Sequence, residues 1–216
     1  GYCYGSGSIK IQYYDPTGLP IDFVRYRFIN YNGKGKYRQS RRGSEIYLPL
    51  TKPTVWPEVY KDKTKPIIIV EGEFKALSTQ IRVPSTTCLA IGGVDSWASE
   101  GSLLPSLRQI VWRDRPVFIA FDSDIVTKPD VQRAEYRLTA VLRAYGARVS
   151  PLRWAPEQGK GLDDYLHNGY DLLELIEKTN NKAGYNEHQY LYDLLSTWGF
   201  YKEKPIRFAD CEKWGM

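Results

Sequence analysis

Two stretches of the sequence decide its fold: residues 67–73, IIIVEGE, and residues 117–124, VFIAFDSD. Each starts with a continuous apolar run, which is typical of a parallel strand buried on both faces. Helix-forming residues follow the first run over 73–80, and a helical pattern over 131–145, ended by Gly146, follows the second. Strands that alternate with helices indicate βαβ units, so we expect an α/β protein with a parallel sheet flanked by helices.

The rest of the second half continues this pattern. Residues 87–91 and 147–154 are predicted to form two further strands of the sheet. Short helices are predicted over 162–167, 172–178 and 189–197. These elements give a parallel-sheet domain over residues 65–168 and a helical C-terminal tail over residues 169–216.

The first 64 residues are different in character. Residues 9–14 and 21–29 alternate apolar and polar side chains, and Asp15-Pro16-Thr17-Gly18 between them suits a type I turn, so a β-hairpin is predicted. Prolines at 49, 53 and 57 indicate a linker that leads to Lys65. We therefore expect a small β-rich subdomain over residues 1–64.

Positive charge is concentrated in this first part. The chain has 30 Lys and Arg against 25 Asp and Glu, but residues 1–65 hold 12 basic and 5 acidic side chains, and residues 66–216 hold 18 and 20. Basic residues interleaved with Tyr and Phe suit a polyanion whose bases stack on rings, although a solvated hairpin has the same pattern. The candidate nucleic-acid or nucleotide ligands are Arg25, Arg27, Lys34, Lys36, Arg38, Arg41 and Arg42.

Acidic residues follow the two apolar runs directly. Glu71 follows the first run, and Asp122 and Asp124 follow the second. Because the carboxyl ends of parallel strands meet at one edge of a sheet, we expect these carboxylates to converge. Like charges held close together raise the pKa of at least one group unless a cation lies between them. All-oxygen ligands favour Mg²⁺ or Mn²⁺, with substrate phosphates completing the coordination shell.

Two further side chains have alternative interpretations. Asp163, or Asp164 beside it, adds another carboxylate to the metal site or only caps the helix that starts there. Lys75 on the first helix faces a phosphate or is an ordinary solvated lysine.

The motifs resemble a known family. VEGE at 70–73, followed by FDSD at 121–124, is similar to the toprim domain of bacterial-type primases, topoisomerases and some nucleases, over about residues 65–168. Over most of the chain, YYDPTGLPIDFVRYRF, KYRQ, VEGEFKAL, AIGGVDSW, AFDSD and KGLDDYL resemble the toprim-like domains of plasmid and phage replication proteins. A glycine usual after the second aspartate is replaced by Ile125-Val126, and the zinc module found upstream in many such primases is not in this chain.

The resemblance implies a function. It makes Glu71 the acid/base or metal-associated residue, and Asp122 and Asp124 the metal ligands, with Asp163 or Asp164 as a further acidic site. The implied activity is a primase-type nucleotidyltransferase that makes short primers from nucleoside triphosphates on single-stranded DNA with Mg²⁺ or Mn²⁺. A replicative helicase, or a helicase domain of the same polypeptide, is the implied partner.

Other functions remain open from the sequence. The same carboxylates serve a metal-dependent nuclease, and a non-catalytic DNA-binding accessory of replication needs only the basic segment. Asp122-Ser-Asp124-Ile-Val also has the D-x-D-x-V form of haloacid-dehalogenase-type phosphatases, in which the first aspartate is the nucleophile. The 39 residues between Asp124 and Asp163 are few for such an enzyme's core, and Glu71 would have no role.

The cysteines and the apolar runs bear on the compartment. The chain has three cysteines, an odd number, and they are far apart: Cys3, Cys88 and Cys211. We therefore expect no disulfide framework, and we expect a reducing, cytoplasmic setting. No apolar run approaches the roughly 18 residues that a membrane helix needs, so no membrane partner is expected. The opening residue Gly1, with no signal sequence after it, suggests a piece excised from a larger protein.

Overall fold

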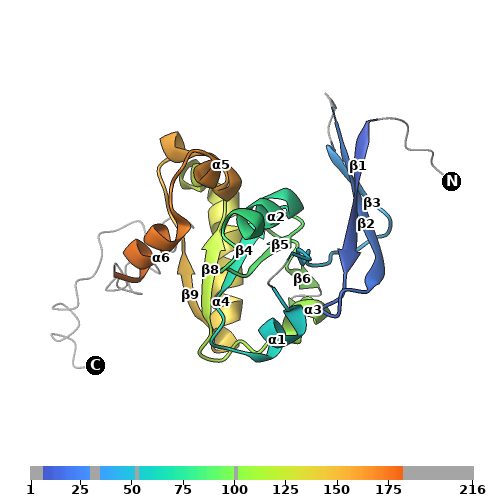
Figure 1. Cartoon of the computed structure of the whole chain (residues 1–216), viewed down its shortest axis with the longest axis horizontal. Coiled ribbons are helices and arrows are strands. Elements are labelled where there is room, and N and C mark those ends of the chain that lie inside the picture. The colour runs from blue at the N-terminus through green and yellow to red at the C-terminus, as the bar shows by residue number, and fades with distance from the viewer. Residues whose placement is uncertain (1–6, 30–34, 52–53, 100–101, 182–216) are drawn as a thin grey trace, which may run out of the picture. The chain divides into compact units, whose positions relative to one another are not determined.

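In the computed structural model, residues 7–29, 35–51, 54–99 and 102–181 are described (Figure 1). The chain divides into a unit of residues 1–179 and a second unit of residues 180–216. The boundaries expected after residues 64 and 168 remain predictions. The helix predicted over 189–197 and the candidate ligand Lys34 lie outside the described residues.

The N-terminal strands form an antiparallel sheet in the order β1-β2-β3, with β1 (Ser8–Tyr14), β2 (Pro20–Phe28) and β3 (Tyr37–Gln39). The predicted hairpin is confirmed: the Gly18 N–H donates to the Asp15 carbonyl at 3.0 Å, and Asp15 Oδ1 accepts from the Thr17 N–H at 2.8 Å. Ile11, Tyr13 and Phe23 form a small core, against which Tyr47 and Phe74 pack. These contacts join the antiparallel sheet to the rest of the unit.

The second sheet is parallel and has the order β5-β4-β8-β9. Its strands are β4 (Ile67–Glu71), β5 (Cys88–Ile91), β8 (Pro116–Ala120) and β9 (Arg148–Pro151). Val70 is opposite Ala120 in the β4–β8 pair, so these neighbouring strands end at the same level. The α/β fold predicted from the sequence is therefore confirmed.

Helices cover both faces of the parallel sheet. Ile67 and Ile69 point into a core shared with α1 (Trp56–Lys61), α3 (Pro105–Arg108) and α4 (Pro129–Ala144). Ile68 and Val70 point into a second core shared with α2 (Glu73–Arg82), α5 (Leu162–His167) and α6 (Leu172–Asn181). Because both faces are buried, the strand has to be apolar at every position rather than at every second one.

The structure departs from the sequence predictions in its short elements. The predicted linker contains α1, whose Pro57 lies in the first turn, where proline is compatible with a helix. Trp56 anchors this helix, since its ring is buried and its Nε1 donates to the Pro49 carbonyl at 2.9 Å. The prediction also missed α3, the β-pair β6 (Ala98–Ser99) and β7 (Ser102–Leu103), and the 3₁₀ turns η1 (Ser123–Thr127) and η2 (Pro156–Gln158). No helix among the described residues has the length and apolarity needed to cross a membrane.

Candidate active site

The carboxyl ends of β4 and β8 bring two of the predicted acidic residues together. Glu71 is the last residue of β4, and Asp122 follows β8 and precedes η1. Gly72 has a positive φ of 99°, which lets the chain turn from Glu71 directly into α2. The first turn of α2 then returns Lys75 to this edge.

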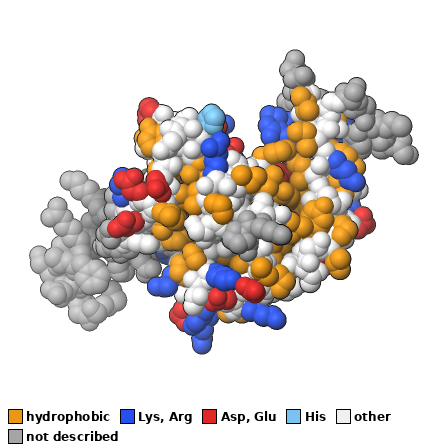
Figure 2. Space-filling model, viewed as in Figure 1, with side chains coloured by type: hydrophobic (Ala, Val, Ile, Leu, Met, Phe, Trp, Pro, Cys, Tyr) orange, Lys and Arg blue, Asp and Glu red, His pale blue; other side chains and the backbone are white. Residues whose placement is uncertain are grey.

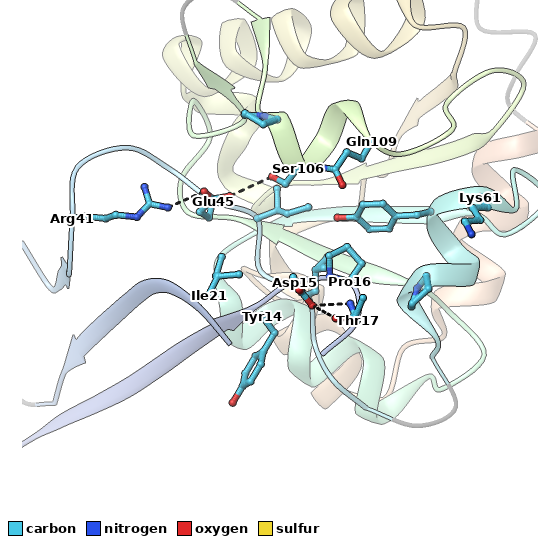
Figure 3. Close-up of a pocket in the computed structure, with 15 residues that line it drawn as sticks. Tyr14, Asp15, Pro16, Thr17, Ile21, Arg41, Glu45, Lys61, Ser106 and Gln109 are labelled. Carbon is cyan, nitrogen blue, oxygen red and sulfur yellow. Dashed lines mark hydrogen bonds and ion pairs between the residues drawn. The ribbon is translucent and has the colours of Figure 1, made fainter. Parts of the chain in front are cut away.

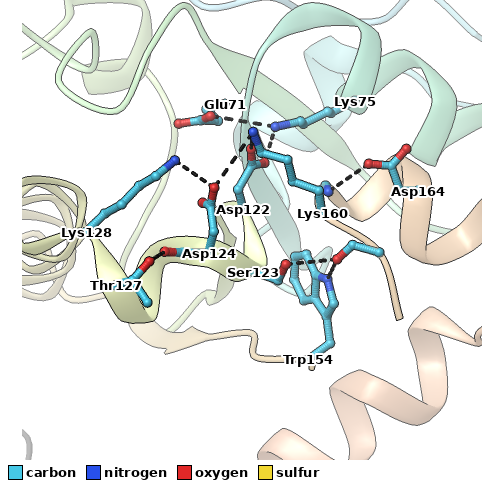
Figure 4. A network of polar contacts seen from close by, with 12 residues as sticks. Glu71, Lys75, Asp122, Ser123, Asp124, Thr127, Lys128, Trp154, Lys160 and Asp164 are labelled. Carbon is cyan, nitrogen blue, oxygen red and sulfur yellow. Dashed lines mark hydrogen bonds and ion pairs between the residues drawn. The ribbon is translucent and has the colours of Figure 1, made fainter. Parts of the chain in front are cut away.

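Lys75 lies between the two carboxylates (Figure 4). Its ammonium donates to Asp122 Oδ1 and lies 3.6 Å from Glu71 Oε1. The Lys75 side chain is only 19% exposed and that of Asp122 13%, so both charges are largely removed from water. The sequence left Lys75 as a phosphate ligand or a solvated lysine, and in this structure it is the counter-ion of two predicted catalytic residues.

Two more lysines reach the second aspartate. Lys128 Nζ lies 2.7 Å from Asp124 Oδ2, and Lys160 Nζ lies 3.7 Å from the same oxygen and 3.9 Å from Asp122 Oδ2. Sequence reasoning missed both lysines. The spacing of four residues between Asp124 and Lys128 was a usable signal, whereas only the tertiary structure brings Lys160 here.

A hydrogen-bonded loop holds Lys160 beside the aspartates. The Gly159 carbonyl accepts from Ser123 Oγ at 2.9 Å and from Trp154 Nε1 at 2.8 Å. The Ser123 N–H donates to the Lys160 carbonyl at 2.8 Å. The loop after η2 is thereby attached to the turn that carries Asp122 and Asp124.

The structure separates the roles of Asp163 and Asp164. Asp164 Oδ2 accepts from the Gly161 N–H at 3.0 Å and so satisfies the start of α5. Asp163 Oδ1 is buried and has no hydrogen-bond partner among the described residues. A Cβ on Gly161 would lie 2.3 Å from Asp163 Oδ1 and 2.8 Å from Lys75 Cε, so glycine is what lets these groups approach the loop. Helix capping therefore belongs to Asp164, and Asp163 is available to the cluster.

The carboxylates differ in their proton affinity. Burial raises the pKa of Glu71, although the Lys75 ammonium acts in the opposite direction. Burial also raises the pKa of Asp163, and the adjacent Asp164 carboxylate adds to the increase. A hydrogen bond from Lys128 holds the pKa of Asp124 below its ordinary value. The two pKa shifts therefore have opposite directions, upward for Glu71 and downward for Asp124.

The donor types at this edge suit Mg²⁺ or Mn²⁺, because all of them are carboxylate oxygens. The unpartnered Asp163 Oδ1 is the kind of atom that a bound ion or water completes. As the side chains are placed, however, no three acidic, His or Cys side chains in the described part of the chain are grouped to hold one metal ion. The residues thus fit the ion in type, and Glu71, Asp122 and Asp124 direct oxygens at lysines.

The predicted nucleic-acid ligands on the antiparallel sheet fall into two groups. Arg25 NH1 lies 2.5 Å from Glu73 Oε1, which also accepts from the Tyr13 hydroxyl at 2.5 Å. The side chains of Arg25 and Glu73 are 12% and 2% exposed, so this is a buried pair. Arg27 lies over the Phe74 ring, with its guanidinium carbon 4.8 Å from the ring centre. These two arginines join β2 to α2.

The other group faces solvent. Lys36, Arg38, Arg41 and Arg42 are exposed. Arg41 is committed locally, because it pairs with Glu45 at 3.0 Å and donates to the Asp22 carbonyl at 2.7 Å. Arg38 and Arg42 form no ion pair with any described residue. On the face shown in Figure 2, Lys and Arg side chains lie over both the β1–β3 sheet and the helical part, whereas most acidic side chains lie over the helical part.

A separate cavity of about 770 Å³ lies away from the carboxylates, between the Asp15–Thr17 turn, α1 and α3 (Figure 3). The Tyr60 hydroxyl, one of its lining groups, is buried and has no hydrogen-bond partner among the described residues. Among the predicted site residues that the structure describes, Arg41 alone lines this cavity.

Comparisons with known proteins agree with this architecture. A family model described as "Domain of unknown function (DUF3854)" matches residues 55–171. No curated protein sequence matches the chain.

Among solved structures, the fold is similar to three primase structures. The zinc-binding and RNA polymerase domains of Aquifex aeolicus primase align with a TM-score of 0.58 and 18% identity, over 94% of this chain and 50% of that one. The Escherichia coli primase catalytic core aligns with a TM-score of 0.59 and 14% identity, over 88% of this chain and 56% of that one. The primase fragment of the bacteriophage T7 primase-helicase protein aligns with a TM-score of 0.52 and 18% identity, over 80% of this chain and 62% of that one.

These likenesses concern the fold. The chain has the fold of a primase-type toprim core, as the motif resemblance implied, and the dehalogenase-type alternative is not supported. The chain spans about half to three fifths of the length of the primase structures that it matches.

Proposed function

The chain belongs to the family described as "Domain of unknown function (DUF3854)", and from this family's primase-like fold we propose that it is a primase-type nucleotidyltransferase module. It synthesises short primers on single-stranded DNA from nucleoside triphosphates. The observation that supports this most directly is the joint presence of Glu71, Asp122 and the nearby Asp124 at one sheet edge, on the same unit as the exposed cations Arg38 and Arg42.

The carboxylates carry the proposed chemistry. Glu71, Asp122 and Asp124, with Asp163, would hold Mg²⁺ or Mn²⁺, and the bound ion would stabilise negative charge on the reacting phosphate and the departing pyrophosphate. Glu71 would take the proton of the attacking 3′-hydroxyl or orient the metal, and the raised pKa of its carboxyl is consistent with the first of these roles. The exposed ammonium groups of Lys128 and Lys160 attract the triphosphate to this edge.

The basic residues in and beside the antiparallel sheet have different proposed roles in DNA binding. Lys36, Arg38 and Arg42 contact the phosphates of the template, because their charges are exposed. Arg41 contributes less, since Glu45 already compensates it. Arg25 and Arg27 act indirectly, by holding β2 against α2. Lys34, outside the described residues, stays a predicted ligand.

The partners follow from the same proposal. Single-stranded DNA and nucleoside triphosphates are the substrates. The likeness to the primase fragment of a phage primase-helicase supports a helicase, or a helicase domain of the same polypeptide, as the replication partner. Plasmid- or phage-type replication in the cytoplasm is the setting that we propose.

The test is incubation with single-stranded DNA, labelled nucleotides and Mg²⁺ or Mn²⁺, with both extension and degradation measured. We expect short products that Asp122→Ala or Asp124→Ala abolishes. Glu71→Gln should lower the rate on the order of 10² to 10⁴, the usual range for a positioned acid or base. Asp130→Ala is the matched control, because Asp130 is an exposed aspartate six positions beyond Asp124 and its carboxylate pairs with the neighbouring Arg133.

The same experiment separates the alternatives. Degradation of DNA without added nucleotides would reassign the chain to the toprim nucleases. If neither activity occurs, and the wild type and the aspartate variants bind DNA equally well, a non-catalytic accessory role replaces the proposal.

A further inference from the structure

The three lysines of the carboxylate cluster are not equivalent. The side chains of Lys128 and Lys160 are 46% and 63% exposed, and each can leave its partner for water at little cost. The Lys75 side chain is 19% exposed and touches two carboxylates. Lys75 is therefore the cation most firmly built into the cluster.

Lys75 also occupies a position confined by its surroundings. Its stem projects from the first turn of α2, and its Cε lies so close to Gly161 that a Cβ there would come within 2.8 Å. The same Cβ would come within 2.3 Å of Asp163 Oδ1, so the lysine stem and this unpartnered oxygen both lie close to one position beside Gly161. The Lys75 ammonium thus lies between Glu71 and Asp122 (Figure 4), and the Asp163 carboxylate is near enough to act on its charge.

A divalent ion needs the same oxygens. Mg²⁺ and Mn²⁺ are bound through carboxylate oxygens, and Asp122 and Glu71 direct one oxygen each at the lysine. This explains why no three acidic, His or Cys side chains of the described residues are grouped for a metal ion, although the carboxylates share one sheet edge. Two cations cannot hold the same carboxylate oxygen at close range without strong mutual repulsion.

We propose that Lys75 is a built-in counter-ion that competes with the divalent ion for Glu71 and Asp122, and so lowers the metal affinity of the protein. Lys75 is in this sense a positioning residue: it holds the carboxylates in the absence of metal and must move aside for metal to bind. The inference rests on the divalent-metal part of the proposed function, but it does not depend on which reaction the metal serves.

The experiment is a titration of the intact chain with Mn²⁺, in which electron paramagnetic resonance reports free Mn²⁺. Lys75→Met keeps most of the length of the side chain and removes its charge, and it should bind Mn²⁺ more tightly than the wild type, by roughly tenfold or more. Lys75→Arg keeps the positive charge and should remain within a few-fold of the wild type. Lys178→Met is the matched control for loss of one positive charge, because Lys178 pairs with Glu174 on the exposed side of α6.

A second measurement compares the melting temperatures of the wild type and Lys75→Met. In the absence of metal, Lys75→Met should melt at a lower temperature than the wild type, since its carboxylates have lost their counter-ion. Saturating Mn²⁺ should raise its melting temperature more than that of the wild type. If Lys75→Met does not fold, Lys75→Gln takes its place with the same expectations.

The outcomes distinguish this inference from the proposed function. Equal Mn²⁺ affinity in the wild type and Lys75→Met overturns the counter-ion role and leaves the metal site intact. Tighter binding by Lys75→Arg as well as Lys75→Met also overturns it, because charge would then not be the cause. Failure of every variant to bind Mn²⁺ overturns both this inference and the metal chemistry of the proposed function.

Discussion

The charged residues of the antiparallel sheet and those of the parallel-sheet edge are compensated in different ways. On β2, Arg25 pairs with Glu73 of α2 in a contact where both side chains are nearly buried. At the end of β4 and β8, three carboxylates share three lysines, two of which are about half exposed. The first arrangement is a buried ion pair that holds the antiparallel sheet against α2. In the second, the two exposed lysines can leave their partners for water, which the proposed binding of metal and phosphate requires.

The largest expected effect comes from removing the buried Arg25–Glu73 ion pair. Arg25→Met leaves the Glu73 carboxylate buried without its cation, and removal of one partner of a buried ion pair typically costs about 3–5 kcal/mol. The free energy of unfolding, measured with urea, should fall by that amount. Arg41→Met is the matched control on the same subdomain, because the Arg41–Glu45 pair is exposed and should be worth no more than about 1 kcal/mol. If the two variants lose the same free energy of unfolding, the distinction between the buried Arg25–Glu73 pair and the exposed Arg41–Glu45 pair is wrong.

A smaller effect concerns Tyr13, whose hydroxyl donates a hydrogen bond to the same Glu73 carboxylate. Burial raises the pKa of Tyr13 well above its ordinary value of 10.0, and the Glu73 carboxylate adds to the increase. As the pH rises past 10.0, the unfolded chain loses this proton first, so the stability present at lower pH is progressively lost. The loss is at most about 1.4 kcal/mol per pH unit. Urea unfolding below and above this pH should show a shallower decline in Tyr13→Phe than in the wild type, and identical slopes would be evidence against the prediction.

The smallest effect concerns the exposed arginines, where only binding should change. If Arg38 and Arg42 each neutralise a DNA phosphate, replacing both with Ala should lower the slope of log affinity against log salt concentration by roughly 1.4, at about 0.7 per contact. Arg41→Ala should change the slope less than Arg42→Ala, because Glu45 already compensates Arg41. Fluorescence anisotropy with labelled single-stranded DNA at several salt concentrations measures this. An unchanged slope in the double variant would identify the segment as a solvated hairpin.

Much of the fold could be predicted because its signals are local. The runs at 67–70 and 117–121 are apolar at every position, and a strand covered on both faces requires that pattern. The turn at Asp15–Gly18 is specified by residues that make its own hydrogen bonds. The predicted linker was wrong at α1, because the six-residue helix depends on the burial of Trp56 and Tyr60 in a core formed by distant strands. Intrinsic propensity says little about so short a helix.

The position of the acidic residues at the sheet edge could be predicted from the sequence, and their ion-pair partners could not. Glu71, Asp122 and Asp124 could be named from the sequence, because a carboxylate after a buried parallel strand must lie at the sheet edge. The partners depend on side-chain directions and on loops that return from elsewhere in the chain. Lys160 is 38 residues beyond Asp122, and hydrogen bonds to the Gly159 and Lys160 carbonyls bring it there. The expected repulsion between carboxylates is relieved in the same way, by cations that sequence reasoning did not place.

The sequence by itself therefore determined the parallel sheet, the hairpin and the edge at which the acids gather, since periodicity and turn chemistry act over a few residues. The tertiary structure decided which charges are buried, which are paired and which remain free. Arg25 and Arg42 are the same residue type in one basic segment, yet one is a buried partner of Glu73 and the other is exposed. The free energy of a charge depends on the dielectric and the counter-charges around it, and those are set only when distant segments pack together.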